Sequence, residues 1–117
     1  LYLFAPFIPY VPKGSLDAHE HWQGYPVNPL KGAIELLRLQ KIVRKRLPAI
    51  QQPVLIVQGR LDTTVAPVAP QIIYDEVASQ VKELHWMEDS SHVVILDKEL
   101  DQIARITLDF IHDATLL

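Results

Sequence analysis

The stretch VLIVQGRLDTTVAP, Val54–Pro67, begins with a run of apolar, mostly β-branched residues and then turns polar. A short continuous apolar run of this kind is typical of a strand buried on both faces of a parallel sheet. Asp62 follows the run in a segment that also contains a glycine. Because aspartate and glycine are common turn residues, position alone gives Asp62 a structural explanation. A second stretch, which carries His92, adds a chemical one.

The second stretch follows another predicted strand. In KELHWM, Lys82–Met87, apolar residues alternate with polar ones, which favours a half-buried or edge strand. Residues 68–78 carry apolar side chains at helical spacing, with Pro67 near the start of the predicted helix. A connection of this length between two strands predicts a right-handed parallel crossover. His92 then lies in the loop after the second strand, within EDSSHVVILD.

These two loops are the candidate site. The carboxyl ends of adjacent parallel strands lie at one edge of a sheet, so we expect Asp62 and His92 to meet there. A carboxylate that accepts a hydrogen bond from imidazole Nδ1–H fixes the tautomer and leaves Nε2 as a general base. Glu88 and Asp89 precede the histidine loop, and Asp97 is predicted to cap the last helix. Asp62 is therefore the preferred acid.

Two longer helices complete the expected order of elements. Pro29 opens a helix that continues to Leu47, with a broad apolar face, cations in its last turns and Pro48 at its end. The last helix is predicted after Asp97 and has an apolar stripe. The residues of that stripe are Leu100, Ile103, Ala104, Thr107, Phe110 and Ile111. Residues 1–29 contain five prolines among aromatic residues, which predicts a loop-rich segment.

Composition excludes several classes of function. The 117 residues are of single-domain length, and a net charge of −3 gives no basic surface for nucleic acid. There is no cysteine, so disulfides and thiolate metal sites are excluded. His19 and His21 could supply two ligands where zinc needs three or four, so no metal site is predicted. The apolar runs are shorter than the ~18 residues of a membrane span.

The two stretches resemble a known family. PVLIVQGRLDTTVAP followed by HWMEDSSHVVILD is similar to the C-terminal third of an α/β-hydrolase, whose triad follows the chain order Ser, Asp, His. Within that superfamily the chain is most similar to bacterial carboxylesterases and monoacylglycerol lipases. The resemblance implies an α/β fold, Asp62 and His92 as catalytic residues, a small acyl-ester substrate and no cofactor. Two positions depart from the family pattern: Ser91 replaces a glycine, and Ala66 replaces a proline.

The resemblance also implies a division of the chain and a missing group. Residues 1–47 are expected to form a cap segment, and residues 48–117 the C-terminal part of the hydrolase core. No G-x-S-x-G motif is present, so the nucleophile and the remaining strands are expected upstream of Leu1. The chain alone is therefore expected to be inactive, and to form an oligomer or associate with its missing N-terminal portion. The expected location is cytoplasmic.

Three alternatives remain open from the sequence. The first is another chemistry of the same fold, such as an epoxide hydrolase or dehalogenase with an aspartate nucleophile. The second is a non-enzymatic relative that keeps Asp62 and His92 but lacks a nucleophile. The third is a truncated product that acts only through assembly. Trp22 and Tyr25 are candidates for lining an acyl pocket, although ordinary packing of a cap on the core explains them equally well.

Overall fold

The computed structural model describes residues 10–12 and 27–116. The elements follow in this order: β1 (Tyr10–Pro12), β2 (Val27–Pro29), α1 (Leu30–Arg46), a 3₁₀ turn η1 (Leu47–Ala49), β3 (Val54–Gly59), α2 (Ala69–Glu76), β4 (Lys82–Met87), a 3₁₀ turn η2 (Val94–Leu96) and α3 (Leu100–Thr115). Strands β1 and β2 pair antiparallel. The predicted strand–helix–strand–helix order from residue 54 onward is confirmed.

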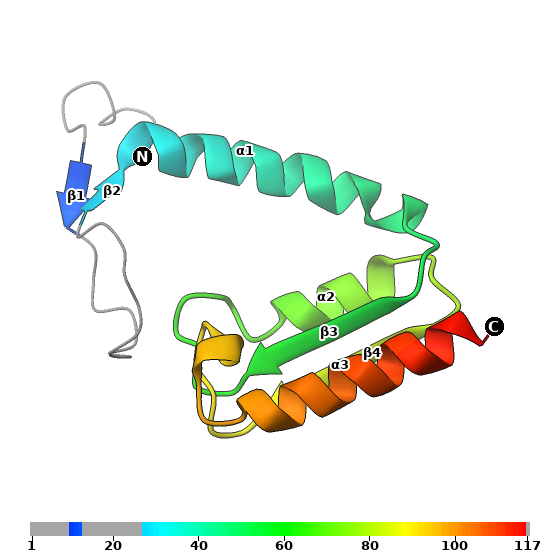
Figure 1. Ribbon diagram of the computed structural model, residues 1–117. Coiled ribbons are helices and arrows are strands. Elements are labelled where there is room, and N and C mark those ends of the chain that lie inside the picture. Colours follow the sequence, from blue (N-terminus) through cyan, green and yellow to red (C-terminus); the bar gives the residue numbers. More distant parts are fainter. Residues whose placement is uncertain (1–9, 13–26, 117) are drawn as a thin grey trace.

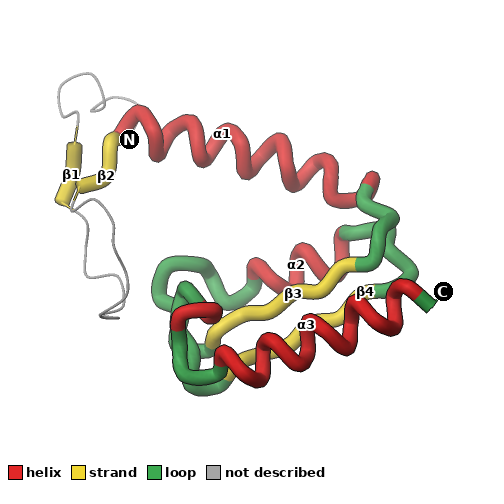
Figure 2. Tube along the Cα trace, viewed as in Figure 1, coloured by secondary structure: helices red, strands yellow, loops and turns green. Residues whose placement is uncertain are grey.

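The parallel pair β3 and β4 is the centre of the fold. Its register runs from Val54 opposite Lys82 to Gly59 opposite Met87, so both strands end at the same edge. Helices α2 and α3 lie on opposite sides of this two-stranded sheet (Figures 1 and 2). The side chains of β3 are only half-buried, because within the described residues the strand has one neighbour. An α/β fold was predicted, and the structure shows part of one.

Helix α2 makes the crossover between the two strands. Its last turn leaves backbone carbonyl groups without helical donors, as every helix end does. The Nζ atom of Lys82, at the start of β4, donates to the carbonyl oxygen of Tyr74 at 2.7 Å and to that of Val77 at 3.2 Å. Val77, which follows the last residue of α2, is itself buried.

Helix α3 begins differently from the prediction. The residue before its first turn is Glu99, and no side chain caps the helix, so the assignment of Asp97 as the cap was wrong. The Asp97 carboxylate accepts hydrogen bonds from Ser91 in the histidine loop, because the 3₁₀ turn η2 brings the chain back to that loop. The apolar stripe of α3 is buried at Ile103 and Phe110.

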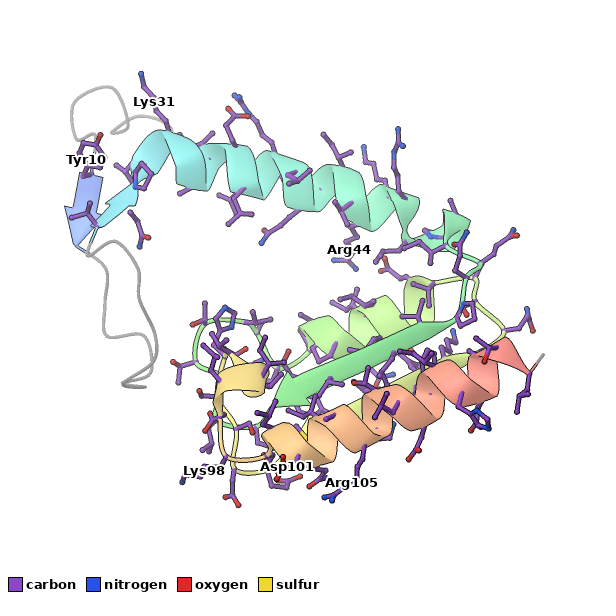
Figure 3. The ribbon with its side chains drawn as sticks, in the orientation of Figure 1. Tyr10, Lys31, Arg44, Lys98, Asp101 and Arg105 are labelled. Atoms are coloured by element: carbon purple, nitrogen blue, oxygen red, sulfur yellow. The ribbon has the colours of Figure 1, made fainter. Side chains whose placement is uncertain are left out.

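Helix α1 lies apart from the sheet, at the opposite side of α2 from β3 (Figure 1). Leu30 and Ile34 are buried, whereas much of the predicted apolar face is exposed when the described residues are considered alone. The exposed side chains are Leu36, Leu37, Leu39, Ile42 and Val43. Figure 3 shows Arg44 pointing from α1 toward α2, where its Nη2 atom lies 2.8 Å from Glu76 Oε1. The radius of gyration is 16.8 Å, above the ~13 Å of a compact domain this long.

Candidate active site

The site lies where β3 and β4 end. The loop after β3 carries Asp62 and the loop after β4 carries His92, and the parallel register places both loops at the same edge of the sheet. His92 Nδ1 lies 3.0 Å from Asp62 Oδ2. The structure therefore brings together the two residues that the sequence proposed. The Asp62 side chain is 3% exposed and that of His92 is 35% exposed, so the pair is covered on the acid side and open on the imidazole side.

The Asp62 carboxylate is held by four donors. Its Oδ1 atom accepts the backbone N–H of Thr64 at 2.7 Å and of Val65 at 3.0 Å, which is the local turn that aspartate favours. Its Oδ2 atom accepts Gln58 Nε2 at 2.7 Å besides His92 Nδ1. Burial alone raises the pKa of Asp62, but the hydrogen bonds from His92, Val65, Gln58 and Thr64 outweigh it and lower the pKa from 3.8 to about 2. Asp62 is ionised at neutral pH.

The ionised acid fixes the tautomer of His92. A carboxylate accepts hydrogen bonds and donates none, so the ring proton of neutral His92 lies on Nδ1. The lone pair is then on Nε2, which is the arrangement that lets an imidazole take a proton from a nucleophile. The negative charge of Asp62 also stabilises the imidazolium that forms when Nε2 is protonated.

Gln58 is a site residue that the sequence did not indicate. It is the penultimate residue of β3, four residues before Asp62. Its Nε2 atom also lies 3.4 Å from the carbonyl oxygen of Gly59. The Gly59 carbonyl oxygen and Asp62 Oδ2 are both acceptors, so the NH₂ group of Gln58, which donates, is the one that faces them. Gln58 thus holds the same carboxylate oxygen that faces His92. A polar side chain at the end of an apolar strand was the available signal.

Gly59 determines how closely the two loops pack. A Cβ atom at this position would lie 2.3 Å from the carbonyl oxygens of both Ser90 and Ser91. The backbone N–H of Leu61 donates to the Ser90 carbonyl oxygen at 3.0 Å, so the acid loop and the histidine loop share a backbone hydrogen bond. Gly59, three residues before Asp62, is therefore required for the close backbone approach of the two loops.

The acid loop is also held from its outer side. The Arg60 guanidinium lies 4.1 Å from the centroid of the Trp86 ring on β4, and its Nε atom lies 3.1 Å from Glu88 Oε1. Because both charged side chains are exposed, the ion pair itself contributes little. The contact of Arg60 with the ring adds apolar and cation–π attraction at this edge.

Two carboxylates hold the histidine loop. Glu99 Oε2 accepts the backbone N–H of Asp89 at 3.0 Å and the hydroxyl of Ser90 at 2.6 Å. Asp97 Oδ2 accepts the backbone N–H of Ser91 at 2.7 Å and its hydroxyl at 2.9 Å. No non-glycine residue described in the structure has positive φ, so serine at position 91 adopts its backbone conformation without that strain.

The remaining histidines take other positions. His85 Nε2 lies 2.7 Å from Glu83 Oε2 on β4, and His112 lies in the last turn of α3. His19, His21 and the proposed pocket residues Trp22 and Tyr25 are outside the described residues. Across residues 10–12 and 27–116, no group of three potential ligands could hold a metal ion. None of the helices in the same ranges is long and apolar enough to cross a membrane.

Comparison with known proteins places this chain in a family. The profile of the serine aminopeptidase S33 family matches residues 18–99, well over half of the chain. The chain belongs to this α/β-hydrolase family. It is 36% identical over 86 residues to a carboxylesterase of Bacillus subtilis (strain 168), and 30% identical over 86 residues to a thermostable monoacylglycerol lipase of Bacillus sp. (strain H-257). Each match covers 74% of this chain and 34% of the relative, so the chain spans about a third of the relatives' length.

A solved structure gives the same result for the fold. It comes from work on LipS and LipT, two metagenome-derived lipolytic enzymes, and matches with a TM-score of 0.82 at 30% identity. The match covers 95% of this chain and 48% of that chain. The predicted resemblance to α/β-hydrolases of the carboxylesterase and monoacylglycerol lipase type is confirmed.

Proposed function

We propose that this chain contributes the acid and the base of a serine hydrolase that cleaves carboxylic esters through an acyl-enzyme. The observation that carries the proposal is the hydrogen bond from His92 Nδ1 to the nearly buried Asp62 carboxylate, at the ends of two adjacent parallel strands. Membership of the S33 family supports it, as does similarity to relatives named carboxylesterase and monoacylglycerol lipase.

In this proposal His92 acts twice. Its Nε2 atom takes the proton of a serine hydroxyl as that oxygen attacks the ester carbonyl carbon, and then gives the proton to the leaving alkoxide. An acyl-serine remains. In the second half, Nε2 takes a proton from water, which attacks the acyl carbonyl, and returns the proton to the serine oxygen. Asp62 stays ionised throughout and stabilises the imidazolium formed in each half.

The nucleophile and the oxyanion donors are supplied from outside these residues. The four serines, Ser15, Ser79, Ser90 and Ser91, are not in a G-x-S-x-G motif, and in this fold the oxyanion amides also precede the acid and the histidine in the chain. The chain alone is therefore expected to be inactive. No metal or cofactor takes part in the proposed reaction, and the cytoplasmic location stays a prediction.

We also assign residues 1–47 to a cap and residues 48–117 to the core. Support comes from α1, which lies apart from the sheet and is joined to α2 by the pair Arg44–Glu76. The exposed apolar side chains of α1 suit a cap that covers other parts of a hydrolase. Cleavage at the junction tests the assignment: limited proteolysis is expected within residues 47–53, and a uniformly resistant chain would contradict it.

The function is tested by complementation. The chain is mixed with an N-terminal α/β-hydrolase segment that carries a G-x-S-x-G elbow, and hydrolysis of a p-nitrophenyl ester is measured beside an aminopeptidase substrate. Ester hydrolysis is expected from the mixture and from neither part alone. His92→Ala is expected to abolish it, whereas His85→Ala, a matched change outside the site, leaves it in place. Saturable ester hydrolysis by the chain alone, or activity that survives His92→Ala, would refute the proposal.

A further inference from the structure

The position of His92 depends on the residue before it. Ser91 is 4% exposed, and its backbone N–H and hydroxyl both donate to Asp97 Oδ2. On its other side, the Ser91 carbonyl oxygen lies against Gly59, where even a methyl group would overlap with it. Ser91 is therefore held between the end of β3 and the Asp97 carboxylate. Few backbone torsions separate this fixed residue from the imidazole, so its placement determines that of His92.

The second oxygen of Asp97 is used as well. Oδ1 accepts the backbone N–H of Lys98 at 2.9 Å. An asparagine at this position has one acceptor oxygen and one NH₂ group. Whichever way the amide turns, its NH₂ faces either the Ser91 donors or the Lys98 donor. The amide therefore loses a hydrogen bond that the carboxylate makes, although its shape is nearly the same.

We propose that Asp97 is a positioning residue, which holds Ser91 and thereby places His92 at hydrogen-bond distance from Asp62. The inference rests on the proposed function for its catalytic meaning, but its geometry can be tested separately. A carboxylate that only stabilised the loop would change the unfolding temperature and leave the ring of His92 in place. A positioning residue changes the ring itself.

The expected change in kcat follows from how far His92 would be displaced. Asp97→Asn is expected to lower kcat in the complemented protein by about 10- to 100-fold, since a misplacement of ~1 Å near a reacting group costs up to ~10²-fold. KM is expected to change little, because Asp97 contacts the histidine loop and makes no proposed contact with substrate.

The matched control is Asp101→Asn. This is the same acid-to-amide change in the first turn of α3, where Figure 3 shows Asp101 on the outer side of the helix. A carboxylate in the first turn interacts favourably with the helix dipole, so this variant is expected to lose some stability. It should leave kcat, KM and the His92 ring signals as they are. The control thus separates loss of stability from loss of position.

The deciding measurement is ¹⁵N NMR of the histidine rings in the full 117-residue chain. The His92 signals are assigned by their loss in His92→Ala. In the parent chain, Nδ1 is expected to carry the hydrogen-bonded proton, and in Asp97→Asn this signal is expected to weaken or shift while Asp101→Asn keeps it. If Asp97→Asn lowers the unfolding temperature but leaves the His92 signals unchanged, the positioning role is refuted.

Two further outcomes are also decisive. If Asp97→Asn does not fold, Ser91→Ala removes one of the two donors and keeps the carboxylate. A shift of the His92 signals in that variant relative to the parent chain supports the proposal, and an unchanged ring refutes it. If the ring signals respond as expected but the parent chain gives no ester hydrolysis on complementation, the proposed function fails and the positioning role stands.

Discussion

The replacement Gly59→Ala is the sharpest structural test of the site. A Cβ atom on Gly59 would lie 2.3 Å from the carbonyl oxygens of Ser90 and Ser91, where an ordinary contact begins at 3.4 Å. The obstacle is backbone, so no side-chain rotation relieves it. The histidine loop has to move by about 1 Å, or the end of β3 does. Either movement stretches the 3.0 Å contact between His92 Nδ1 and Asp62 Oδ2.

The expected losses follow from that displacement. Overpacking of this kind costs about 1–3 kcal/mol of unfolding free energy, measured on the chain by urea denaturation. A shift of ~1 Å at the general base is expected to lower kcat of the complemented protein by about 100-fold, with KM less affected. The His92 Nδ1 proton signal should weaken in the same variant.

Gly32→Ala is the matched control for this change. In α1 the nearest atom to the new methyl group is Pro29 Cγ at 3.2 Å, in a ring that can adjust its pucker. Gly32 is in the first turn of α1, and alanine is a better helix former than glycine by up to ~1 kcal/mol, so stability is expected to stay or rise. If Gly59→Ala kept the parent values of stability, kcat and the Nδ1 signal, the close approach of the two loops would have no role in placing His92.

Other predictions follow from the same geometry. Asp62→Asn is expected to lower kcat by about 10⁴-fold on complementation, because the amide favours the wrong tautomer of His92; a loss similar to that of Asp101→Asn would refute the role of Asp62. Gln58→Ala removes one donor to the carboxylate, so the pKa of Asp62 is expected to rise from about 2 toward 3.8 in a ¹³C titration, and an unchanged pKa would contradict this. Because the pKa of Asp62 is lower in the folded chain than in the unfolded one, its contribution of about 2 kcal/mol is complete above pH 3.8 and is lost as the pH falls toward 2. Acid unfolding of Asp62→Asn should lack this component. The chain is also expected to sediment as an oligomer or with a partner, and a well-folded monomer of 13.3 kDa would count against it.

Much of the fold could be predicted because local signals agreed with each other. The apolar run at Val54–Val57, the alternation at Lys82–Met87 and the intervening helical spacing each favoured one element, and together they required a parallel pair. That pair alone brought Asp62 and His92 to one edge of the sheet. Their meeting therefore followed from topology, without any knowledge of side-chain contacts.

The residues that support the pair could not be found in this way. Gln58 acts through a side-chain contact whose direction depends on the twist at the end of β3, and Gly59 through a backbone approach between segments far apart in the chain. Asp97 was misassigned because an acid shortly before a helix has a local explanation as a cap. In the structure, Asp97 instead accepts two hydrogen bonds from Ser91, because the 3₁₀ turn after His92 brings Asp97 back to the histidine loop.

The exposed apolar surface and the incomplete site both indicate that this chain associates with a further segment. The Asp62–His92 pair orients a base but provides no attacking atom, and β3 has a neighbouring strand on one edge only within the described residues. Strand β3 and helix α1 both present apolar side chains that are only partly covered there. Pairing at the open edge of β3 would bury apolar surface, and in the α/β-hydrolase chain order the nucleophile elbow belongs to the segment that precedes the acid and the histidine. Association that stabilises this chain is therefore expected to be the step that completes the site, so activity and protection of β3 amides from hydrogen exchange should appear together on complementation. Protection without activity would separate assembly from catalysis and favour the interpretation that this chain acts only through assembly.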